Sequence, residues 1–346
     1  MAFLTGTDKD YIGVAVIGAG RAGLIHARNF RRNVPGAKLV AVADPDPAAR
    51  ESAAESLEIE KAYADYKEVL EDREVGAVVV VVPTALHRDI VVGAAAAGKH
   101  ILCEKPMAMT VSECGDMIAA AAGADVRLQI GFMRRYDRSY RKAKETVLSG
   151  AIGDVVMVRS NSRGPSVPQP WMYDIRKSNG PLAEVCSHDI DTLRWFTESE
   201  FKTIYAAGGN FRCPDAKADW PDFYDNVIVS ATFENGMQGI MDGAQGVGYA
   251  YDARTEVLGT KGCVFIGRLA DESVVTCTAE GNSGQSPLVK SWRQLFESAY
   301  LTEDISFVEC IRNGTEPEVT GRDGLMAVKV VNAGNRSIIE KRVVEL

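Results

Sequence analysis

The sequence predicts a two-domain α/β protein, in which a doubly wound parallel sheet comes first and an α+β domain with a largely antiparallel sheet comes second. Three observations predict this architecture. Short apolar strands alternate with helices over residues 1–131, a glycine-rich turn follows the first strand, and hairpin-like strands replace the alternation over residues 132–346. A chain of 346 residues is also too long for one ordinary core.

The first domain is expected to contain short apolar strands, each followed by a helix. Residues 75–82 are apolar without interruption, as in a central parallel strand that is covered on both faces. Pro45 and Pro47 open a helix, since proline is tolerated in a first turn, and Gly98 closes a later helix as a left-handed cap. The expected strands are residues 11–17, 38–43, 75–82, 100–103 and 126–130, and the expected helices include residues 24–30, 45–57 and 90–97.

The turn after the first strand reads Gly-Ala-Gly-Arg-Ala-Gly over residues 18–23. Gly18 permits a tight turn, Gly20 lets a pyrophosphate approach the backbone, and Gly23 lets the following helix pack closely. Phosphate oxygens would then meet free N–H groups at the positive end of the helix, with Arg21 and Ala22 in the same loop. The pattern predicts a dinucleotide site, and an ordinary strand–helix turn is the alternative.

Asp44 ends the next strand, about 20 residues past the last glycine, which is the spacing of a ribose-binding carboxylate. Such a carboxylate accepts hydrogen bonds from the adenosine ribose hydroxyls and repels a 2′-phosphate, and no Arg follows it directly. The sequence therefore predicts NAD rather than NADP as the cofactor. The alternative is an Asp44 that only faces solvent.

The second domain changes to strands separated by Asn-Gly and Lys-Gly turns, which predicts consecutive hairpins in an antiparallel sheet. Met237, Ile240 and Met241 indicate apolar material on an open face of this sheet, so we expect a homo-oligomer, a tetramer or dimer, built there. The expected strands are residues 155–162, 226–233, 236–241, 255–258 and 263–266, and the expected helices are residues 140–148, 305–311 and 324–339, the last a candidate to pack back on the first domain.

Composition excludes several classes of function. Hydrophobic residues make up 46% of the chain and charged residues 25%, as in a globular protein, and the net charge of −8 disfavours nucleic acid as a partner. No apolar run is long enough to span a membrane and no leader pattern is visible, so we expect a cytoplasmic protein. The seven cysteines are scattered without a CxxC pair, which argues against a disulfide framework or a zinc site.

The run Cys103-Glu104-Lys105-Pro106 directly follows a strand of the predicted parallel sheet. Ligands bind at the carboxyl ends of the strands in such sheets, so Glu104 and Lys105 are expected beside the nicotinamide. The alternative is a surface lysine before a proline-started helix.

The segment 180–196 combines a histidine with acidic residues. If it is one helix, Glu184, His188, Asp191 and Trp195 share a face at helical spacing. Histidine has the pKa of a general base, and a carboxylate one turn earlier would hold its tautomer. The same pattern fits a structural histidine near a helix N-terminus whose acidic residues favour the helix dipole, and the residues alone do not choose between the two.

At these residues the sequence resembles the glucose–fructose oxidoreductase and inositol dehydrogenase family, Gfo/Idh/MocA, along nearly its whole length. The resemblance lies in the glycine-rich turn, Pro83-Thr84 with His87, Glu104-Lys105-Pro106, Gly-Phe-Met-Arg-Arg-Tyr over residues 131–136, and the His-x-x-Asp of residues 188–191. It implies an NAD-binding Rossmann domain over residues 1–131 and a substrate-binding α+β domain over residues 132–346.

The resemblance also implies a role for each matching residue. Lys105 would hold the reacting hydroxyl, His188 would take or return its proton with Glu184 beside it, and Asp191 would bind a neighbouring hydroxyl. Pro106 would follow a cis bond, and no metal is expected. The other residues expected to bind cofactor are Gly18, Gly20, Arg21, Ala22, Gly23, Asp44, Pro83, Thr84, His87 and Glu104, and the others expected to bind substrate are Arg135, Tyr136, Ser162, Arg163, Trp171 and Tyr251.

Two departures from the family pattern bear on the substrate. Glu184 stands where inositol dehydrogenases carry aspartate, and Ser162-Arg163-Gly164 stands where they carry His-Arg-Asn. Two ring contacts are thus missing, which disfavours myo-inositol and favours another cyclic polyol, a free sugar or a glucoside oxidised at C3. The loop 169–173, with Trp171, offers aromatic faces for a sugar ring, and a packed surface loop is the alternative.

The expected function is therefore NAD-dependent, reversible oxidation of a secondary ring hydroxyl to a ketone. An inositol 2-dehydrogenase proper is one alternative. A non-catalytic NAD-binding regulatory protein on the same scaffold is the other, and the presence of both Lys105 and His188 argues against it.

Overall fold

The computed structural model describes residues 11–269, 276–279, 281–283 and 287–346, and the chain forms two compact units. The first unit holds the described residues up to Met107 together with Ser112–Gly131 and Tyr300–Arg322. The second unit holds Ala108–Val111, the described residues of Phe132–Ala299, and Asp323–Leu346. The division expected at residue 131 thus differs mainly at Tyr300–Arg322, which belongs with the first unit, whereas the C-terminal helix beyond Arg322 belongs with the second.

The first unit is built on a six-stranded parallel sheet in the order β3-β2-β1-β4-β5-β6. Its strands are β1 (Ile12–Ile17), β2 (Ala37–Ala43), β3 (Lys61–Tyr63), β4 (Ala77–Val80), β5 (His100–Glu104) and β6 (Leu128–Gly131). The chain adds strands first on one side of β1 and then, from β4, on the other, so the β1–β4 boundary is the topological switch point where such sheets bind ligands. The expected doubly wound parallel sheet is confirmed.

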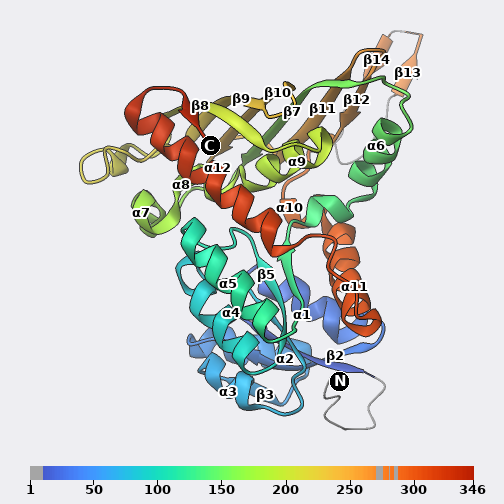
Figure 1. Cartoon of the computed structure of the whole chain (residues 1–346), viewed down its shortest axis with the longest axis vertical. Coiled ribbons are helices and arrows are strands. Elements are labelled where there is room, and N and C mark those ends of the chain that lie inside the picture. Colours follow the sequence, from blue (N-terminus) through green and yellow to red (C-terminus); the bar gives the residue numbers. More distant parts are fainter. Residues whose placement is uncertain (1–10, 270–275, 280, 284–286) are drawn as a thin grey trace. The chain divides into compact units, whose positions relative to one another are not determined.

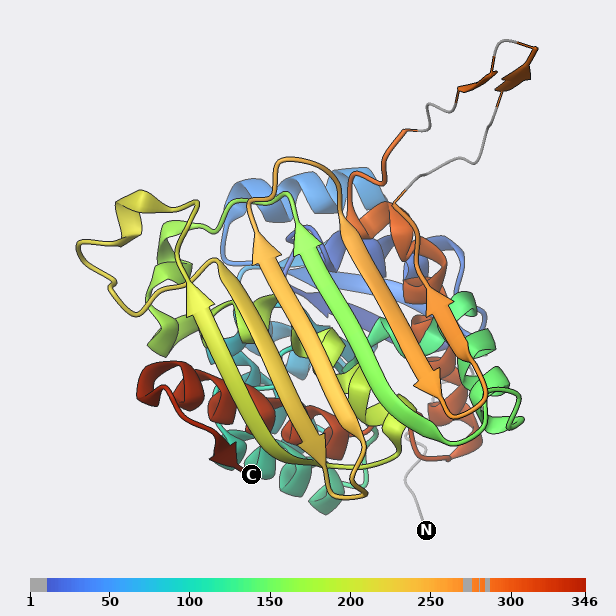
Figure 2. The ribbon, with the colours of Figure 1, turned by 90° about the horizontal axis from the view of Figure 1, so that it is seen from above.

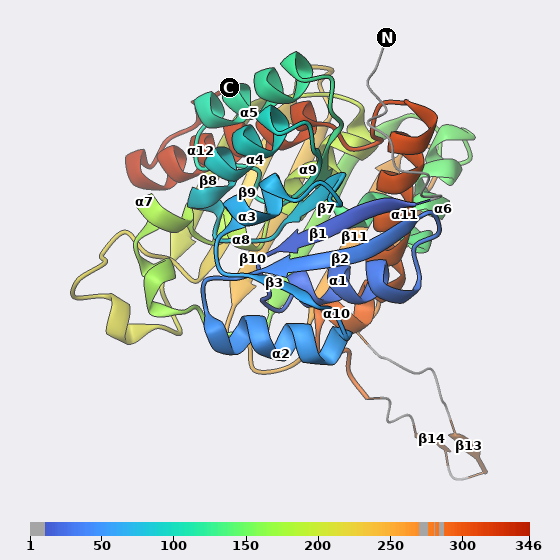
Figure 3. The same cartoon turned by 90° about the horizontal axis from the view of Figure 1, so that it is seen from below.

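The helices of the first unit are α1 (Gly23–Arg32), α2 (Pro47–Leu57), α3 (Tyr66–Glu71), the 3₁₀ turn η1 (Thr84–Leu86), α4 (His87–Ala96), α5 (Val111–Gly123) and most of α11 (Glu297–Asn313). They cover both faces of the sheet, with α1 and α2 on one side and α4 and α5 on the other (Figure 3). Phe30 of α1, Leu57 of α2 and Phe307 of α11 pack in one buried core with the valines of β1 and with Val79 of β4.

Local sequence sets these elements. All four residues of β4 are fully buried, as the uninterrupted apolar run predicted. The side chain of Asp46 accepts a hydrogen bond from Ala48 N at 2.9 Å, so α2 begins at Pro47 behind its cap rather than at Pro45. Gly98, after α4, has a φ of +69°, the left-handed conformation expected of it.

The second unit is built on a mixed seven-stranded sheet in the order β12-β11-β7-β10-β9-β8-β15 (Figure 2). Its strands are β7 (Val155–Gly164), β8 (Phe201–Gly209), β9 (Asn226–Phe233), β10 (Gln238–Gln245), β11 (Asp252–Gly259), β12 (Cys263–Ile266) and β15 (Val344–Glu345), and β13 (Thr276–Thr278) pairs separately with β14 (Gly281–Ser283). The hairpins β9–β10 and β11–β12 form as predicted. The expectation of consecutive hairpins throughout is wrong at one point, because β7 lies between β10 and β11 and runs parallel to β10.

The helical segments of the second unit are η2 (Met133–Tyr136), α6 (Arg138–Leu148), η3 (Pro170–Tyr173), α7 (Ile175–Ser178), α8 (Gly180–Glu184), α9 (Ser187–Thr197), η4 (Pro214–Ala216), α10 (Trp292–Leu295) and nearly all of α12 (Gly321–Glu340). α8, α9 and α12 lie along one face of the sheet (Figure 1). Glycines of β10 permit this approach, since a Cβ on Gly243 would lie 2.2 Å from Cys186 Sγ and one on Gly239 would lie 2.8 Å from the Leu193 side chain.

The other face of the seven-stranded sheet carries exposed side chains. β9 and β10 alternate between buried and exposed residues along most of their length. Met241, which the sequence placed on this face, is instead fully buried, because it neighbours the exposed Ile240 and so points to the opposite side. The exposed large apolar residues of the open face are Tyr205, Ile228, Ile240, Leu258 and Phe265.

Candidate active site

The glycine-rich turn lies at the carboxyl end of β1, at the switch point of the first unit. Gly18 has a φ of +104°, and a Cβ there would lie 2.2 Å from the carbonyl oxygen of Val81. A Cβ on Gly23 would lie 1.9 Å from the carbonyl oxygen of Gly18, so α1 packs on the turn only without a side chain at that position. Gly20 is exposed and a Cβ there would meet nothing within 4 Å, which leaves the backbone open to a ligand.

Asp44 follows β2 and is tied to this turn. Its Oδ2 accepts a hydrogen bond from Ala19 N at 2.7 Å, and its Oδ1 accepts one from Asp46 N at 2.9 Å. The first turn of α1 carries no acidic residue, and its N-cap, Ala22, makes no side-chain cap. An open glycine backbone, an uncapped helix N-terminus and a fixed carboxylate match the phosphates and the ribose of a dinucleotide, so the residues present fit NAD.

Pro83 and Thr84 follow β4, and His87 begins the next helix. His87 is buried, with its Nε2 2.9 Å from the carbonyl oxygen of Val82 and its Nδ1 3.0 Å from that of Pro106. Burial lowers the pKa of His87, while the backbone carbonyl oxygens that face both ring nitrogens oppose this effect. The ring thus links the segment after β4 to the segment after β5. The contact of His87 with the cofactor stays a prediction.

Glu104 and Lys105 stand at the carboxyl end of β5, which neighbours β4 in the sheet. Glu104 is buried, and its Oε2 accepts a hydrogen bond from Lys105 N at 2.9 Å. The Lys105–Pro106 bond is cis, as the resemblance implied. The structure therefore brings the glycine turn, Thr84 and Lys105 to one edge of a single sheet.

Residues 180–196 form two helices rather than the one helix expected from the sequence. α8 ends at Glu184 and α9 begins at Ser187. The N–H groups of Val185 and Cys186 both donate to the carbonyl oxygen of Pro181, which stops the hydrogen-bond ladder of α8. Glu184 is therefore not placed beside His188 by helical spacing, whereas His188, Asp191 and Trp195 do share α9.

His188 and Asp191 are buried on α9, and the ring of Phe132 meets the imidazole edge-on at 5.9 Å between centroids. Arg135 donates two hydrogen bonds to Asp191, from Nε to Oδ2 at 2.9 Å and from Nη2 to Oδ1 at 2.5 Å. Burial lowers the pKa of Arg135, but the carboxylates of Asp191 and Asp323 outweigh that effect and raise it. Arg135 is therefore a cation paired with Asp191.

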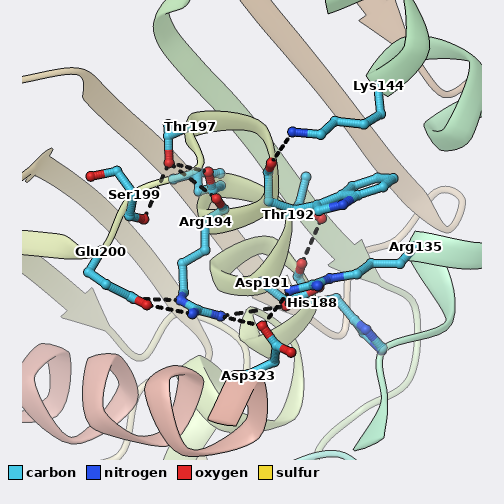
Figure 4. A network of polar contacts seen from close by, with 12 residues as sticks. Arg135, Lys144, His188, Asp191, Thr192, Arg194, Thr197, Ser199, Glu200 and Asp323 are labelled. Carbon is cyan, nitrogen blue, oxygen red and sulfur yellow. Dashed lines mark hydrogen bonds and ion pairs between the residues drawn. The ribbon is translucent and has the colours of Figure 1, made fainter. Parts of the chain in front are cut away.

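The pair of Arg135 and Asp191 belongs to a larger polar network (Figure 4). Asp323, at the start of α12, accepts hydrogen bonds from Arg135 at 2.9 Å and from Arg194 at 3.2 Å. Arg135 and Lys144 lie 6.0 Å and 5.9 Å from the centroid of the Trp195 ring. These residues border a hollow of about 480 Å³ in the second unit.

A second buried network joins α9 to β7. Arg134 is 1% exposed, and its guanidinium donates to Asp189 Oδ1 at 2.7 Å and to Ser162 Oγ at 2.6 Å. Ser160 also donates to Asp189 Oδ1, at 2.5 Å. Burial raises the pKa of Tyr251, which lies beside Arg134, to about 12, so its hydroxyl stays protonated at neutral pH.

The structure does not bring all the predicted substrate residues together. Successive residues of β7 point to opposite faces, so Ser162 is buried toward α9 while Arg163 lies on the open face, paired with Asp242 at 2.6 Å and 3.0 Å. Trp171 is half exposed in η3, whereas Tyr173 of the same turn is buried. The aromatic loop is thus packed at one residue and open at another.

Comparison with known proteins places this fold among its relatives. A model described as an oxidoreductase family with an NAD-binding Rossmann fold matches residues 12–132, and a model described as a GFO/IDH/MocA C-terminal domain matches residues 140–265. A myo-inositol 2-dehydrogenase of Thermotoga maritima is 35% identical over 333 residues, which covers 96% of this chain and 98% of that protein. The chain belongs to the GFO/IDH/MocA oxidoreductase family.

Two further proteins are similar over nearly the same length. A scyllo-inositol 2-dehydrogenase (NAD(+)) of Bacillus subtilis is 34% identical, with 96% of this chain and 95% of that protein covered. The crystal structure of a scyllo-inositol dehydrogenase from Lactobacillus casei with bound NAD(H) and scyllo-inositol is 29% identical and has a TM-score of 0.87, with 97% of this chain and 99% of that chain covered.

Sequence reasoning missed part of the polar interior of this family member. Arg134 and Asp189 received no role, yet they form a buried ion pair beside the pair of Arg135 and Asp191. The signal was present, because two consecutive arginines face two aspartates that are two residues apart on one helix. Tyr136, predicted to bind substrate, is buried in η2.

Two expectations from the sequence concerned membrane-spanning helices and disulfides. None of the helices described is both long and apolar enough to cross a membrane. No disulfide joins the six cysteines whose side chains are described, and the side chain of Cys277 lies outside the described residues.

Proposed function

We propose that this protein is an NAD-dependent dehydrogenase that reversibly oxidises a secondary ring hydroxyl of a cyclic polyol, a sugar or a glycoside to a ketone. The observation that carries the proposal is the placement of an open glycine turn after β1 and of Glu104 and Lys105 after β5 at one edge of a switch-point sheet. The relatives named as myo-inositol and scyllo-inositol dehydrogenases favour a cyclic polyol within this class.

The proposed cofactor is NAD rather than NADP. The carboxylate of Asp44 is fixed by two backbone N–H groups beside the glycine turn, where it can accept hydrogen bonds from ribose hydroxyls. A 2′-phosphate would bring like charge to the same place. The relative with NAD(H) in its crystal structure supports the same choice.

Oxidation of a ring hydroxyl requires the loss of its proton and of a hydride from the same carbon. NAD, when bound, takes the hydride. His188 is the proposed base for the proton, because imidazole has an unperturbed pKa close to neutral pH. Lys105 is proposed to hold the hydroxyl and to stabilise the developing alkoxide as a cation. Glu184 is proposed to stabilise the protonated form of His188.

Asp191 is proposed to accept a hydrogen bond from a neighbouring hydroxyl of the substrate. Arg135 already donates to both of its oxygens, but each carboxylate oxygen has a second lone pair. Burial raises the pKa of Asp191, and the Arg135 cation opposes this effect. Arg135 also fixes the orientation of the carboxylate while leaving it able to accept. This arrangement makes Arg135 a positioning residue in the proposal rather than a direct ring contact.

Ser162 bears on the choice among ring substrates. Its hydroxyl accepts a hydrogen bond from Arg134, so the short side chain is engaged by the protein and does not replace the reach of the family's histidine. We therefore favour a ring other than myo-inositol. A myo-inositol 2-dehydrogenase is the second candidate, because a relative of that name is 35% identical over nearly the whole chain.

One experiment tests the proposed function. NADH formation is followed with inositols, aldoses and glucosides as substrates, and cofactor bound to the purified protein is assayed in parallel. We expect turnover with at least one cyclic polyol, sugar or glucoside. Stoichiometric NAD binding without turnover across the panel would refute the dehydrogenase and favour a non-catalytic NAD-binding protein.

We also infer that the protein forms a homo-oligomer through the open face of the seven-stranded sheet. Tyr205, Ile228, Ile240, Leu258 and Phe265 expose apolar surface on this face. Exposed apolar patches of this kind mark interfaces in soluble proteins. A second copy of the same sheet face would bury them by a two-fold contact.

A further inference from the structure

A buried cluster of ionisable side chains adjoins the Glu104-Lys105 turn in the first unit. It consists of His26 from α1, Glu104 from β5, and Glu303 and Asp304 from α11. His26, Glu303 and Asp304 are fully buried, and Glu104 is 5% exposed. Charged groups without water must pair with one another or become neutral, so the protonation of this cluster has to be accounted for.

Both ring nitrogens of His26 face carboxylates. Nδ1 lies 2.7 Å from Asp304 Oδ1, and Nε2 lies 3.3 Å from Glu104 Oε1. An imidazole can donate from both nitrogens only when it is protonated. Burial lowers the pKa of His26, but the carboxylates of Asp304 and Glu104 outweigh burial and raise it well above its ordinary value. His26 is therefore an imidazolium.

The two carboxylates that face His26 are held at their second oxygens as well. Glu104 Oε2 accepts the hydrogen bond from Lys105 N at 2.9 Å, and Asp304 Oδ2 accepts one from Asn29 Nδ2 at 2.8 Å. A Cβ on Gly131 would lie 3.0 Å from the carboxyl carbon of Glu104, so the glycine leaves the space beside this carboxylate that a larger residue would restrict. The orientation of Glu104 thus fixes the backbone of Lys105.

Glu303 is the member of the cluster without a donor. Neither of its carboxyl oxygens has a hydrogen-bond partner among the described residues, although one lies within 4.8 Å of a ligand atom of His26 and of Glu104. Gln129 donates from Nε2 to the backbone oxygen of Glu303 at 3.2 Å, while its own buried Oε1 has no described donor. Burial and the charge of Glu104 raise the pKa of Glu303 well above its ordinary value.

We propose that Glu303 is a positioning residue for Lys105: it stands as a neutral carboxylic acid beside Glu104 and, with His26 and Asp304, keeps the Glu104 carboxylate on the backbone N–H of Lys105. The role in catalysis rests on the proposed function of Lys105, whereas the protonation of the cluster does not. With one proton on His26 and one on Glu303, two carboxylates remain against one imidazolium. A divalent cation bound by His26, Glu104 and Glu303 would give the cluster the same net charge. Such a cation would bind the lone pair of His26 Nε2, whereas the contact with Glu104 requires a proton on that nitrogen.

Nitrogen NMR of the imidazoles tests the protonation directly. The chain has four histidines, so the resonances of His26 are assigned by their loss in His26→Gln. We expect imidazolium shifts for His26 to persist above pH 7.5. A neutral His26 at pH 7, or a stoichiometric divalent metal in protein purified without chelator, would overturn the proposal.

The pH dependence of unfolding tests Glu303. Its pKa is raised in the folded state, so between the ordinary value near 4.3 and the folded value the native protein holds a proton that the unfolded chain has lost. Stability contributed by that proton falls as pH rises. We expect the free energy of unfolding to fall less from pH 6 to pH 9 in Glu303→Gln than in the wild type. Equal slopes would contradict a neutral Glu303.

Kinetics separate positioning from mere packing. Glu303→Gln keeps a neutral side chain of the same shape, so kcat per NAD-binding site should stay within about twofold of the wild type. Glu303→Ala should lower it roughly tenfold or more while the Kd for NAD is unchanged, since a misplaced catalytic group costs up to about a hundredfold. Glu309→Gln, on the exposed side of α11, is the control.

Two outcomes would overturn the positioning role. Glu303→Gln could be as slow as Glu303→Ala, which would mean that an ionised carboxylate is needed. Glu303→Ala could unfold at lower temperature yet keep its kcat per NAD-binding site, which would leave only packing. If Glu303→Ala does not fold, the kcat of Glu303→Gln is the deciding measurement. A kcat roughly tenfold or more below the wild type would then overturn the positioning role. If the wild type turns over no substrate, the proposed function fails, while the NMR and unfolding results still judge the cluster.

Discussion

Arg134 and Arg135 are adjacent in the chain but serve different networks. Arg134 reaches the strand side of α9 and pairs with Asp189, whereas Arg135 pairs with Asp191 and meets Asp323 of α12. Each buried charge on α9 therefore has a partner, which is the condition for keeping such charges away from water. His188 lies one residue before Asp189, so both networks restrain the position of the proposed base.

At the residue scale, Asp44 should decide the cofactor. Asp44→Ala should weaken NAD and partly relieve the exclusion of NADP, because it removes both the ribose acceptor and the repelling charge. The measurement is kcat/KM for the two cofactors. Asp65→Ala removes the carboxylate that caps α3, away from the glycine turn, and should leave their ratio unchanged. A wild-type enzyme that prefers NADP would contradict the assignment.

The proposed catalytic residues should separate chemistry from cofactor binding. His188→Ala and Lys105→Ala should each lower kcat by roughly 10²-fold or more, the scale of lost acid–base catalysis. The Kd for NAD should change little in either variant, since neither change touches the glycine turn. Glu184→Gln should cost less than both, because it keeps the position of the side chain and loses only the charge.

The informative control for these variants is NAD binding measured on the same preparations. If His188→Ala keeps a kcat close to the wild-type value, the base is another group, and Tyr136 and Asp191 are the next to change. If all three variants lose NAD binding together, the loss is one of folding and not of catalysis.

Substrate choice is the third expectation at this scale. myo-Inositol should not have the highest kcat/KM of the substrate panel, because Ser162 and Gly164 replace family ring contacts and Ser162 is already engaged by Arg134. Polar groups matched to a substrate hydroxyl discriminate strongly between substrates, so their loss should be visible in specificity. The expectation fails if myo-inositol surpasses every sugar and glucoside tested.

Parts of the site that lie within one short motif could be predicted from the sequence. The glycine turn, Asp44 and Glu104-Lys105 each follow a strand, and their chemistry depends on local spacing. Their partners could not be predicted in the same way. His26 and Asp304 are 278 positions apart, and no periodicity in the sequence relates such residues.

At the scale of elements, uninterrupted apolar runs were predicted better than helix breaks and strand pairings, and β8 and α5 were not predicted. The apolar runs of β1, β4 and β9 gave strands at the expected places. The break between α8 and α9 was missed because it depends on tertiary packing, where Cys186 sits against Gly243 of β10. The parallel pairing of β7 with β10 was missed because the turn residues between neighbouring strands predict hairpins only. They do not indicate that β7, which comes earlier in the chain, lies between β10 and β11.

The contact between α9 and β10 gives a testable expectation at this scale. Gly243→Ala should lower the free energy of unfolding by about 1–3 kcal/mol, the usual cost of overpacking, because its Cβ would lie 2.2 Å from Cys186 Sγ. Gly248→Ala is the control, since a Cβ there meets nothing within 4 Å. Urea unfolding measures both, and equal stability of the two variants would count against close packing at this point.

At the scale of the whole molecule, the open sheet face should control assembly. Ile228→Lys combined with Ile240→Lys should shift the protein toward monomer, because it puts charge in the apolar surface proposed to be buried. Leu148→Lys, at an exposed apolar residue of α6, should not. Light scattering at micromolar concentration measures the mass, and a monomeric wild type would refute the interface.

The first unit is not continuous in the chain, and this bears on how the protein is made. Synthesis proceeds from the N-terminus at roughly 5–20 residues per second, so β1 to β6 leave the ribosome long before α11 does. Until Tyr300–Arg322 is synthesised, the core formed by the valines of β1 and Val79 of β4 lacks Phe307, and His26 lacks Asp304. The unit that begins first is therefore completed only after most of the second unit has been translated. A fragment ending at Gly131 would lack part of the hydrophobic core of the first unit. A nascent chain paused there would expose apolar surface to which chaperones bind.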